Sequence, residues 1–256
     1  FNIVFKNFPE DPLGKRSLFF YGVSLFQLGY FEFSDIAFSQ YVAIQSHPEY
    51  FEEVIYYKFE IAEAFRKGAY RHLFGIKRLP RLLPGDKLAE EIYDEVIALA
   101  PTSEAAVQSY YFKAFHLWNQ REFKEAILSL ETLIRKFPKH ELAPESYIAI
   151  NQIYYDWSMY EFQNPDILAL AMINTERFER DFPSEPRVEQ AQCNLLEIQE
   201  AYARGLYETA KYFERRGKCE ASVIYYKKTF KQFPETAHAS KALRRLNKLC
   251  PSCLEE

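Results

Sequence analysis

The sequence is poor in glycine and cysteine. Its 256 residues include eight glycines and four cysteines. So little glycine argues against a β-rich fold built on tight turns and against glycine-rich phosphate-binding loops. No apolar run is long enough to span a membrane as a helix. The uncharged segment 17–31 resembles a signal-peptide core, but it contains Gln27 and lacks a small-residue cleavage site. Because the chain starts with Phe1 and not Met, we expect a true leader to have been removed.

Enzyme motifs are also missing. The five histidines are scattered without metal-site spacing, and the sequence holds no nucleophile elbow, P-loop or dinucleotide fingerprint. Cys250 and Cys253 have C-x-x-C spacing, but they follow a helical segment at the end of the chain and lack a thioredoxin-like context. We interpret them as a tail disulfide or incidental thiols. The sequence therefore predicts no catalytic residue, no metal site and no cofactor.

The chain contains apolar, aromatic and charged residues in proportions that allow it to form a folded core. Apolar residues make up 48% of it, aromatic residues 17% and charged residues 27%. The net charge of −4 is uneven. Segment 211–248 holds eleven basic residues against three acidic ones, and segment 71–87 holds five against one. Two basic patches on an acidic body favour acidic protein surfaces or lipid headgroups as partners and argue against nucleic acid.

A repeat organises the chain. Five segments end in a proline, and in four of them the residue twelve positions earlier is small: the prolines are Pro48, Pro101, Pro138, Pro183 and Pro234, and the earlier residues are Ile36, Ala89, Ala126, Ala171 and Ser222. A small residue lets two helices approach closely, and a proline stops the helix before it. Upstream of these segments, Gly29, Gly68 and Gly217 stand where a helix would end.

The repeating unit is therefore helix, turn, helix, proline, which is the tetratricopeptide pattern. It predicts an all-α superhelix of about five helix pairs, a terminal capping helix and no sheet. Residues 1–256 are expected to form one array, with repeats 1–3 in 17–140 and repeats 4–5 and the cap in 141–256. The excess length of the second unit is expected to be an exposed inserted loop at 71–86, with Pro80 and Pro84.

The first helices of such repeats line a concave groove. Alignment on the turns assigns seven apolar residues to a candidate peptide groove: Phe19, Val23, Phe26, Phe65, Tyr111, Phe115 and Trp118. The alternative is that these side chains form the core between repeats. The basic residues of the fifth unit, with Arg204, Lys211, Arg215 and Arg216 as candidate partner-binding residues, either contact a partner or belong to a solvated face.

The carboxy-terminal half carries a family resemblance. A helix over 166–182, a long helix through Ala203–Phe213, the run Glu214-Arg215-Arg216-Gly217 and the close Phe233-Pro234-Glu235-Thr236 together resemble the BamD family of outer-membrane β-barrel assembly lipoproteins. That resemblance implies a non-enzymatic scaffold at the periplasmic face of the outer membrane of a Gram-negative bacterium. The implied partners are the barrel subunit's periplasmic domains, with Arg216 at the contact, and unfolded outer-membrane proteins with their carboxy-terminal signals. Membrane attachment would occur only through a lipid anchor, whose cysteine is not among these residues.

Two other functions fit the repeat. One is a peptide-binding adaptor or co-chaperone that uses the aromatic groove, and the other is an envelope protein that coordinates wall synthesis or division. A leader sequence would separate them from the assembly lipoprotein: a lipobox cysteine, a plain signal peptide and no leader point to different compartments.

Overall fold

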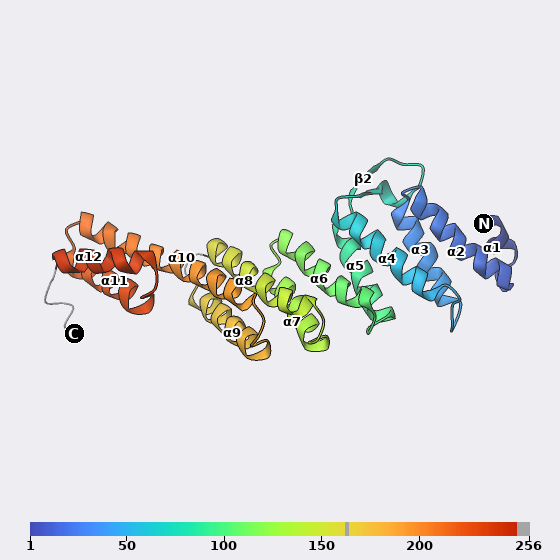
Figure 1. Cartoon of the computed structure of the whole chain (residues 1–256). Helices are drawn as coiled ribbons and strands as arrows, with labels where there is room; N and C mark the ends of the chain where they lie inside the picture. Colours follow the sequence, from blue (N-terminus) through green and yellow to red (C-terminus); the bar gives the residue numbers. More distant parts are fainter. Residues whose placement is uncertain (162–163, 250–256) are drawn as a thin grey trace. The chain divides into compact units, whose positions relative to one another are not determined.

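A computed structural model describes residues 1–161 and 164–249. The chain divides into two compact units, which we call unit 1, Phe1–Phe137, and unit 2, Pro138–Glu256 (Figure 1). Both are built from antiparallel helix pairs.

Unit 1 holds three helix pairs preceded by one short helix. Its elements are α1 (Asn2–Asn7), α2 (Pro12–Gln27), α3 (Phe31–Ala43), α4 (Phe51–Arg66), β1 (Tyr70–His72), the 3₁₀ turn η1 (Leu73–Gly75), β2 (Arg81–Pro84), α5 (Asp86–Leu99), α6 (Glu104–Asn119) and α7 (Phe123–Lys136). The pairs are α2 with α3, α4 with α5, and α6 with α7.

Unit 2 holds two helix pairs and a terminal helix. Its elements are α8 (Leu142–Tyr160), α9 (Pro165–Asp181), α10 (Val188–Arg215), α11 (Cys219–Gln232) and α12 (Ala237–Leu249). The 28-residue α10 is long enough to pack on α8 and α9 at one end and on α11 and α12 at the other. The prediction of an all-α repeat fold with five helix pairs and a terminal helix is confirmed.

In the first, second, third and fifth repeats, the turn after the first helix uses a positive-φ backbone conformation. Gly29, Gly68 and Gly217 have φ of +70°, +96° and +72°. In the third repeat Arg121 takes the same conformation at φ +65°, although it has a Cβ. The turn geometry nevertheless repeats: the N–H three residues after the last helical residue bonds back to a carbonyl of the last turn, as Tyr30 does to Leu25 at 2.9 Å and Glu122 to Leu117 at 3.0 Å.

The second helices end alike where the sequence predicts a proline stop. Phe137, Phe182 and Phe233 each cap a helix with φ between −136° and −129° and ψ between 56° and 63°. Each precedes a proline, which keeps the preceding residue out of the helical conformation. The positions twelve residues before the prolines are fully buried in four repeats: Ala89, Ala126, Ala171 and Ser222.

The first repeat departs from this alignment. Ile36, matched above to the small position, is 61% exposed, and its neighbour Ala37 is buried. Helix α3 also ends at Ala43, well before Pro48. The alignment that puts Ile36 at the equivalent position therefore fails in this repeat, because its helix ends earlier and its buried face is shifted by one residue.

Segment 71–86 differs from the expected loop. It contains η1 and most of an antiparallel hairpin in which Tyr70 pairs with Pro84 and His72 with Arg81, so the expectation of no sheet is wrong here. The reason is an anchor that local sequence does not reveal. His72 is buried, and its N–H donates to Glu32 Oε1 at 2.7 Å from a helix forty residues earlier in the chain.

Candidate functional site

The basic residues of segment 204–248 lie along α10, on the helices α11 and α12 that pack on its carboxy-terminal half, and in the turn between α10 and α11. Arg204, Lys211 and Arg215 are spaced by seven and four residues, which places them on one face of the helix. Arg204 and Arg215 are exposed, and Lys211 is half-buried with Glu208 Oε1 at 3.6 Å from its Nζ. The structure thus brings three of the four predicted partner-binding residues onto one face.

Arg216, the fourth, is the last residue of this set and lies at the helix end. It caps α10, and its N–H donates to the carbonyls of Tyr212 and Phe213 at 3.2 and 3.1 Å. Its guanidinium lies over the Tyr212 ring, 5.3 Å from the centroid. A cation at this end of a helix is favoured by the helix dipole, which accounts for part of its presence. Its side chain is nevertheless exposed, with its hydrogen-bonding fork available to solvent.

The acidic residue that precedes these two arginines is already engaged. Glu214 accepts a hydrogen bond from the Tyr226 hydroxyl at 2.7 Å and lies 3.2 Å from Arg245 of α12. Burial and the bond to Glu214 raise the pKa of the Tyr226 hydroxyl above its ordinary value. Within the described residues, neither Arg215 nor Arg216 forms an ion pair with a carboxylate. This end of α10 therefore offers two arginines to a partner, and nothing in the spacing along the sequence reveals the pairing that satisfies Glu214.

Two hollows border Arg204. One, of 550 Å³, is lined by Tyr155, Leu196, Glu197, Glu200, Ala201, Arg204, Glu235, Thr236, Ala237 and His238. The other, of 510 Å³, is lined by Arg204, Gly205, Glu208, Thr209, Tyr212 and Phe213. The Glu200 carboxylate accepts a hydrogen bond from the Ala237 N–H at 2.8 Å and contacts His238. It therefore binds the first turn of α12. The first hollow is formed by residues of α8, α10 and α12, so sequence reasoning did not identify it. The second is lined by α10 alone.

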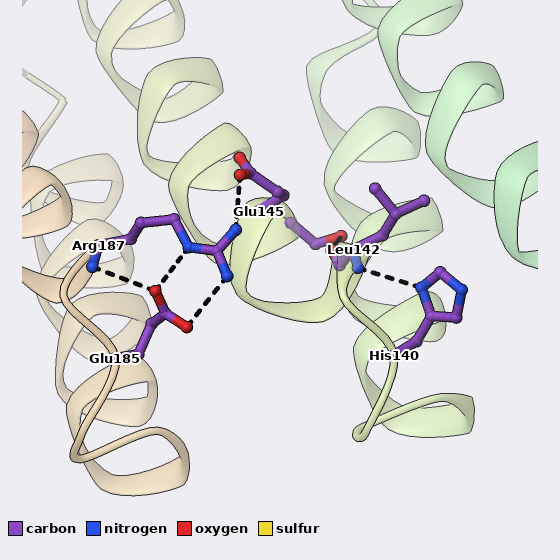
Figure 2. A network of polar contacts seen from close by, with 6 residues as sticks. His140, Leu142, Glu145, Glu185 and Arg187 are labelled. Carbon is purple, nitrogen blue, oxygen red and sulfur yellow. Dashed lines mark hydrogen bonds and ion pairs between the residues drawn. The ribbon is translucent and has the colours of Figure 1, made fainter.

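The start of α10 is held by an ion-pair network at its base. Arg187 donates to Glu185 from Nε at 2.6 Å and to Glu145 of α8 from Nη1 at 2.6 Å, as Figure 2 shows. The bonds to Glu185 and Glu145 outweigh partial burial and raise the pKa of Arg187. This network joins the start of α10 to α8. It therefore helps to fix the orientation of α10 on α8, and with it the position of the basic residues on α10.

The seven residues of the predicted peptide groove separate into two groups. Phe19 and Phe65 are buried in the core of unit 1, with Phe19 stacked on Tyr50 at 4.4 Å, and they present no surface to a peptide. Val23 and Phe26 are half-buried against the same core. Burial contradicts the assignment of Phe19 and Phe65 to the groove, because alignment of repeats cannot tell the groove face from the face between repeats when both are aromatic. The assignment of Val23 and Phe26 stays a prediction.

On α6 the aromatic residues do reach the surface. Tyr111, Phe115 and Trp118 are half-buried and form a ladder, with ring centroids 4.8 Å apart between the first two and 5.5 Å between the last two. We call these three residues the α6 ladder. The assignment of the α6 ladder to the predicted groove stays a prediction.

Other chemistry is sparse in the part of the chain that the structure describes. There, no group of three or more His, Cys, Asp and Glu side chains could hold a metal ion, and no helix is both long and apolar enough to cross a bilayer. Cys193 and Cys219 are exposed free thiols. Cys250 and Cys253, the predicted C-x-x-C pair, lie outside the described residues.

Comparison with known proteins gives one family match and several structural likenesses. The model of the family described as "YfiO: Outer membrane lipoprotein" matches residues 87–249. No curated protein matches the chain. Among solved structures, kinesin light chain TPR-like repeats from Podosopora anserina match at 18% identity, with a TM-score of 0.37, 86% of this chain and 98% of that chain covered. A tetratricopeptide repeat protein from Parabacteroides merdae matches at 11% identity, with a TM-score of 0.35, 95% of this chain and 87% of that chain covered.

Proposed function

The chain belongs to the YfiO family of outer membrane lipoproteins, and on this premise we propose that it is a non-enzymatic scaffold of the machinery that assembles outer-membrane β-barrel proteins. It works at the periplasmic face of a Gram-negative outer membrane, where a lipid anchor of the family's type holds it. Its partners are the barrel subunit's periplasmic domains and unfolded outer-membrane proteins. In the single repeat array 1–256, repeats 1–3 receive substrate, and repeats 4–5 with the cap bind the barrel subunit.

The observation that carries this proposal is the exposed pair Arg215 and Arg216 at the end of α10. Glu214, the nearest acid in sequence, is occupied by Tyr226 and Arg245. The stretch 211–248 has a net charge of +8, from eleven basic and three acidic residues, in a chain whose total is −4. A partner with an acidic surface would be steered to this end, and an arginine fork suits capture of a carboxylate.

The α6 ladder is proposed as the substrate-binding element. Aromatic side chains supply large contact area at low conformational cost, and Tyr111, Phe115 and Trp118 present theirs on one helix face. Carboxy-terminal signals of unfolded barrel proteins, if they end in an aromatic residue, would pack on such a ladder. The same ladder would also serve a peptide-binding adaptor or co-chaperone, which is the second candidate function.

The decisive experiment measures binding to the barrel subunit and binding to signal peptides. It uses the variants Arg216→Glu, Arg135→Glu and Phe115→Ala. Calorimetry or pull-down with the barrel subunit's periplasmic domains tests Arg216→Glu at low and high salt. Loss of the contact should cost about 2–5 kcal/mol if it is buried in the complex, and about 0.2–1 kcal/mol at the rim. Arg135→Glu is the matched control, because Arg135 is also an exposed basic residue in the last turn of a helix. Phe115→Ala is tested against peptides that carry a carboxy-terminal signal.

Each result has a defined meaning. Arg216→Glu should weaken barrel-subunit binding and leave the melting temperature close to that of Arg135→Glu. Wild-type binding by Arg216→Glu would refute its role at the contact, and unfolding of that variant alone would make it a structural cap. Peptide binding through Phe115 without any binding of the barrel subunit would support the adaptor. Absence of both would favour an envelope coordinator of wall synthesis or division.

A further inference from the structure

The hairpin of unit 1 is an exposed structure with apolar side chains at its tip. We call residues 70–84 the hairpin. Phe74 is 84% exposed, Leu82 61% and Ile76 50%, and none of the residues of strand β2 is buried. A two-stranded hairpin has no core of its own in which to bury such side chains. These three side chains are therefore apolar surface that the rest of unit 1 leaves uncovered.

Basic residues flank this tip in the sequence. Arg71, Lys77, Arg78 and Arg81 lie in the hairpin, and Lys87 follows it, against the single acid Asp86. Lys77 Nζ and the Arg81 guanidinium lie 4.3 and 4.8 Å from the centroid of the Tyr30 ring, so two of the cations are held in place. Arg78 is exposed and forms no hydrogen bond or ion pair with another described residue.

The base of the hairpin is rigid, although its tip is exposed. His72 is buried, stacks on Tyr30 with ring centroids 5.4 Å apart, and bonds to Glu32 through its backbone N–H at 2.7 Å. Gly85 fits against Phe65 so closely that a Cβ would lie 2.2 Å from the ring. The projection of the tip from α3 and α4 is thus fixed by packing.

The tip itself holds an unusual backbone conformation. Phe74 has φ +51° and ψ +19°, a left-handed conformation that is uncommon for a bulky residue. The 3₁₀ turn and the Leu73 N–H bond to the Pro80 carbonyl at 3.1 Å maintain it. A strained backbone conformation persists only where the surrounding structure enforces it. Here it accompanies the most exposed aromatic ring of the hairpin, that of Phe74.

From these observations we infer that the hairpin is a membrane-surface binding element, with an anionic lipid bilayer as its ligand. Phe74, Ile76 and Leu82 enter the boundary between headgroups and acyl chains, and the cations bind lipid phosphates. A bilayer accepts a few apolar side chains at a time and requires no complementary shape. A stable protein interface, in contrast, buries about 800 Å² on each partner. The inference does not depend on the proposed partners, because it concerns unit 1 and lipid alone.

Flotation with vesicles tests the inference on the full chain without a lipid anchor. The wild type should float with vesicles of phosphatidylcholine and phosphatidylglycerol and should not float with phosphatidylcholine alone or at high salt. Arg78→Gln should weaken this binding about fivefold, the loss expected for one cation at an anionic surface. Phe74→Gly should weaken it about tenfold, and it keeps the positive φ because glycine accepts that conformation.

Matched controls exclude general effects of charge and of apolar surface. Arg135→Gln removes a cation elsewhere in unit 1, and Leu128→Ala removes an apolar side chain that is 59% exposed on α7. Neither should change vesicle binding. Equal losses in these controls, or wild-type binding by both hairpin variants, would overturn the inference. So would hairpin variants that bind vesicles normally but lose the barrel subunit, a result that would make the hairpin a protein contact.

Discussion

The polar side chains buried in the two units differ in charge. In the described residues, every acidic or basic side chain that is buried lies in unit 1: Glu32, Asp35, Lys58 and Glu63, with His72 and His116. Unit 2 buries serine, threonine and asparagine instead. Its central example is Asn151, whose amide donates to Thr175 at 2.8 Å and to the Ala191 carbonyl at 3.2 Å, and which accepts from Asn174.

One charged cluster of unit 1 joins the three consecutive helices α3, α4 and α5. Lys58 of α4 is fully buried and donates to Asp35 of α3 at 2.5 Å, Ser39 at 2.8 Å and Glu95 of α5 at 2.6 Å. Burial raises the pKa of Asp35, against the opposing effect of Lys58. Such a group contributes little when paired and costs much when its partner is removed. The comparison teaches that unit 1 is held by contacts that respond to pH, whereas the named amide network of unit 2 has no group to titrate.

The largest effect is expected from Lys58→Met, which leaves Asp35 buried beside Glu95 without a cation. Removing one partner of a buried pair should cost about 3–5 kcal/mol. The control is Lys113→Met, whose partner Asp94 is largely exposed and whose loss should cost about 1 kcal/mol or less. Hydrogen exchange read separately in each unit measures both. Similar protection in the two variants, or a loss confined to unit 2, would contradict the expectation.

Acid should weaken unit 1 through Glu63. Burial would raise the pKa of this carboxyl, but hydrogen bonds from Arg66, Tyr93 and Lys67 outweigh it and lower the pKa from 4.5 to about 2. Because the folded pKa is depressed, the stabilisation is present above pH 4.5 and is lost as the pH falls toward 2. Its full size is about 3 kcal/mol.

Denaturant unfolding of unit 1 between pH 4.5 and 2 should show a free energy of unfolding that falls as the pH falls. Glu63→Gln should make this dependence on pH weaker. A slope that persists in Glu63→Gln would assign the acid sensitivity to another carboxyl. The exchange of amides around Asn151 in unit 2 should change less over the same range, because that network is neutral.

The smallest effect is expected at the positive-φ glycine turns, a feature that both units have. Gly68 in unit 1 and Gly217 in unit 2 have positive φ, and a Cβ at either would meet nothing within 4 Å. Alanine there should cost about 1 kcal/mol through the backbone alone, equally in both units. Thermal unfolding measures it, with asparagine at the same positions as the control because it tolerates this conformation. Unequal costs would show that the two turns are not equivalent.

Much of the fold follows from local sequence. The helix ends at Phe137, Phe182 and Phe233 are set by the prolines that follow them, and the turns at Gly29, Gly68 and Gly217 by residues free to adopt positive φ. The shared face of Arg204, Lys211 and Arg215 follows from helical spacing alone. These features depend on residues within a few positions of one another, so a single sequence determines them.

Tertiary structure decided the rest. Burial of Phe19 and Phe65, the engagement of Glu214 by Arg245, and the anchoring of the hairpin through His72 and Glu32 each join residues that are distant in the chain. An aromatic residue has the same local pattern in a groove and in a core, and a lysine such as Lys58 has the same pattern on a surface and in a buried ion pair. Only the packing of one helix on another removes water from such a side chain, and that loss of water settles whether it binds a partner or stabilises the fold.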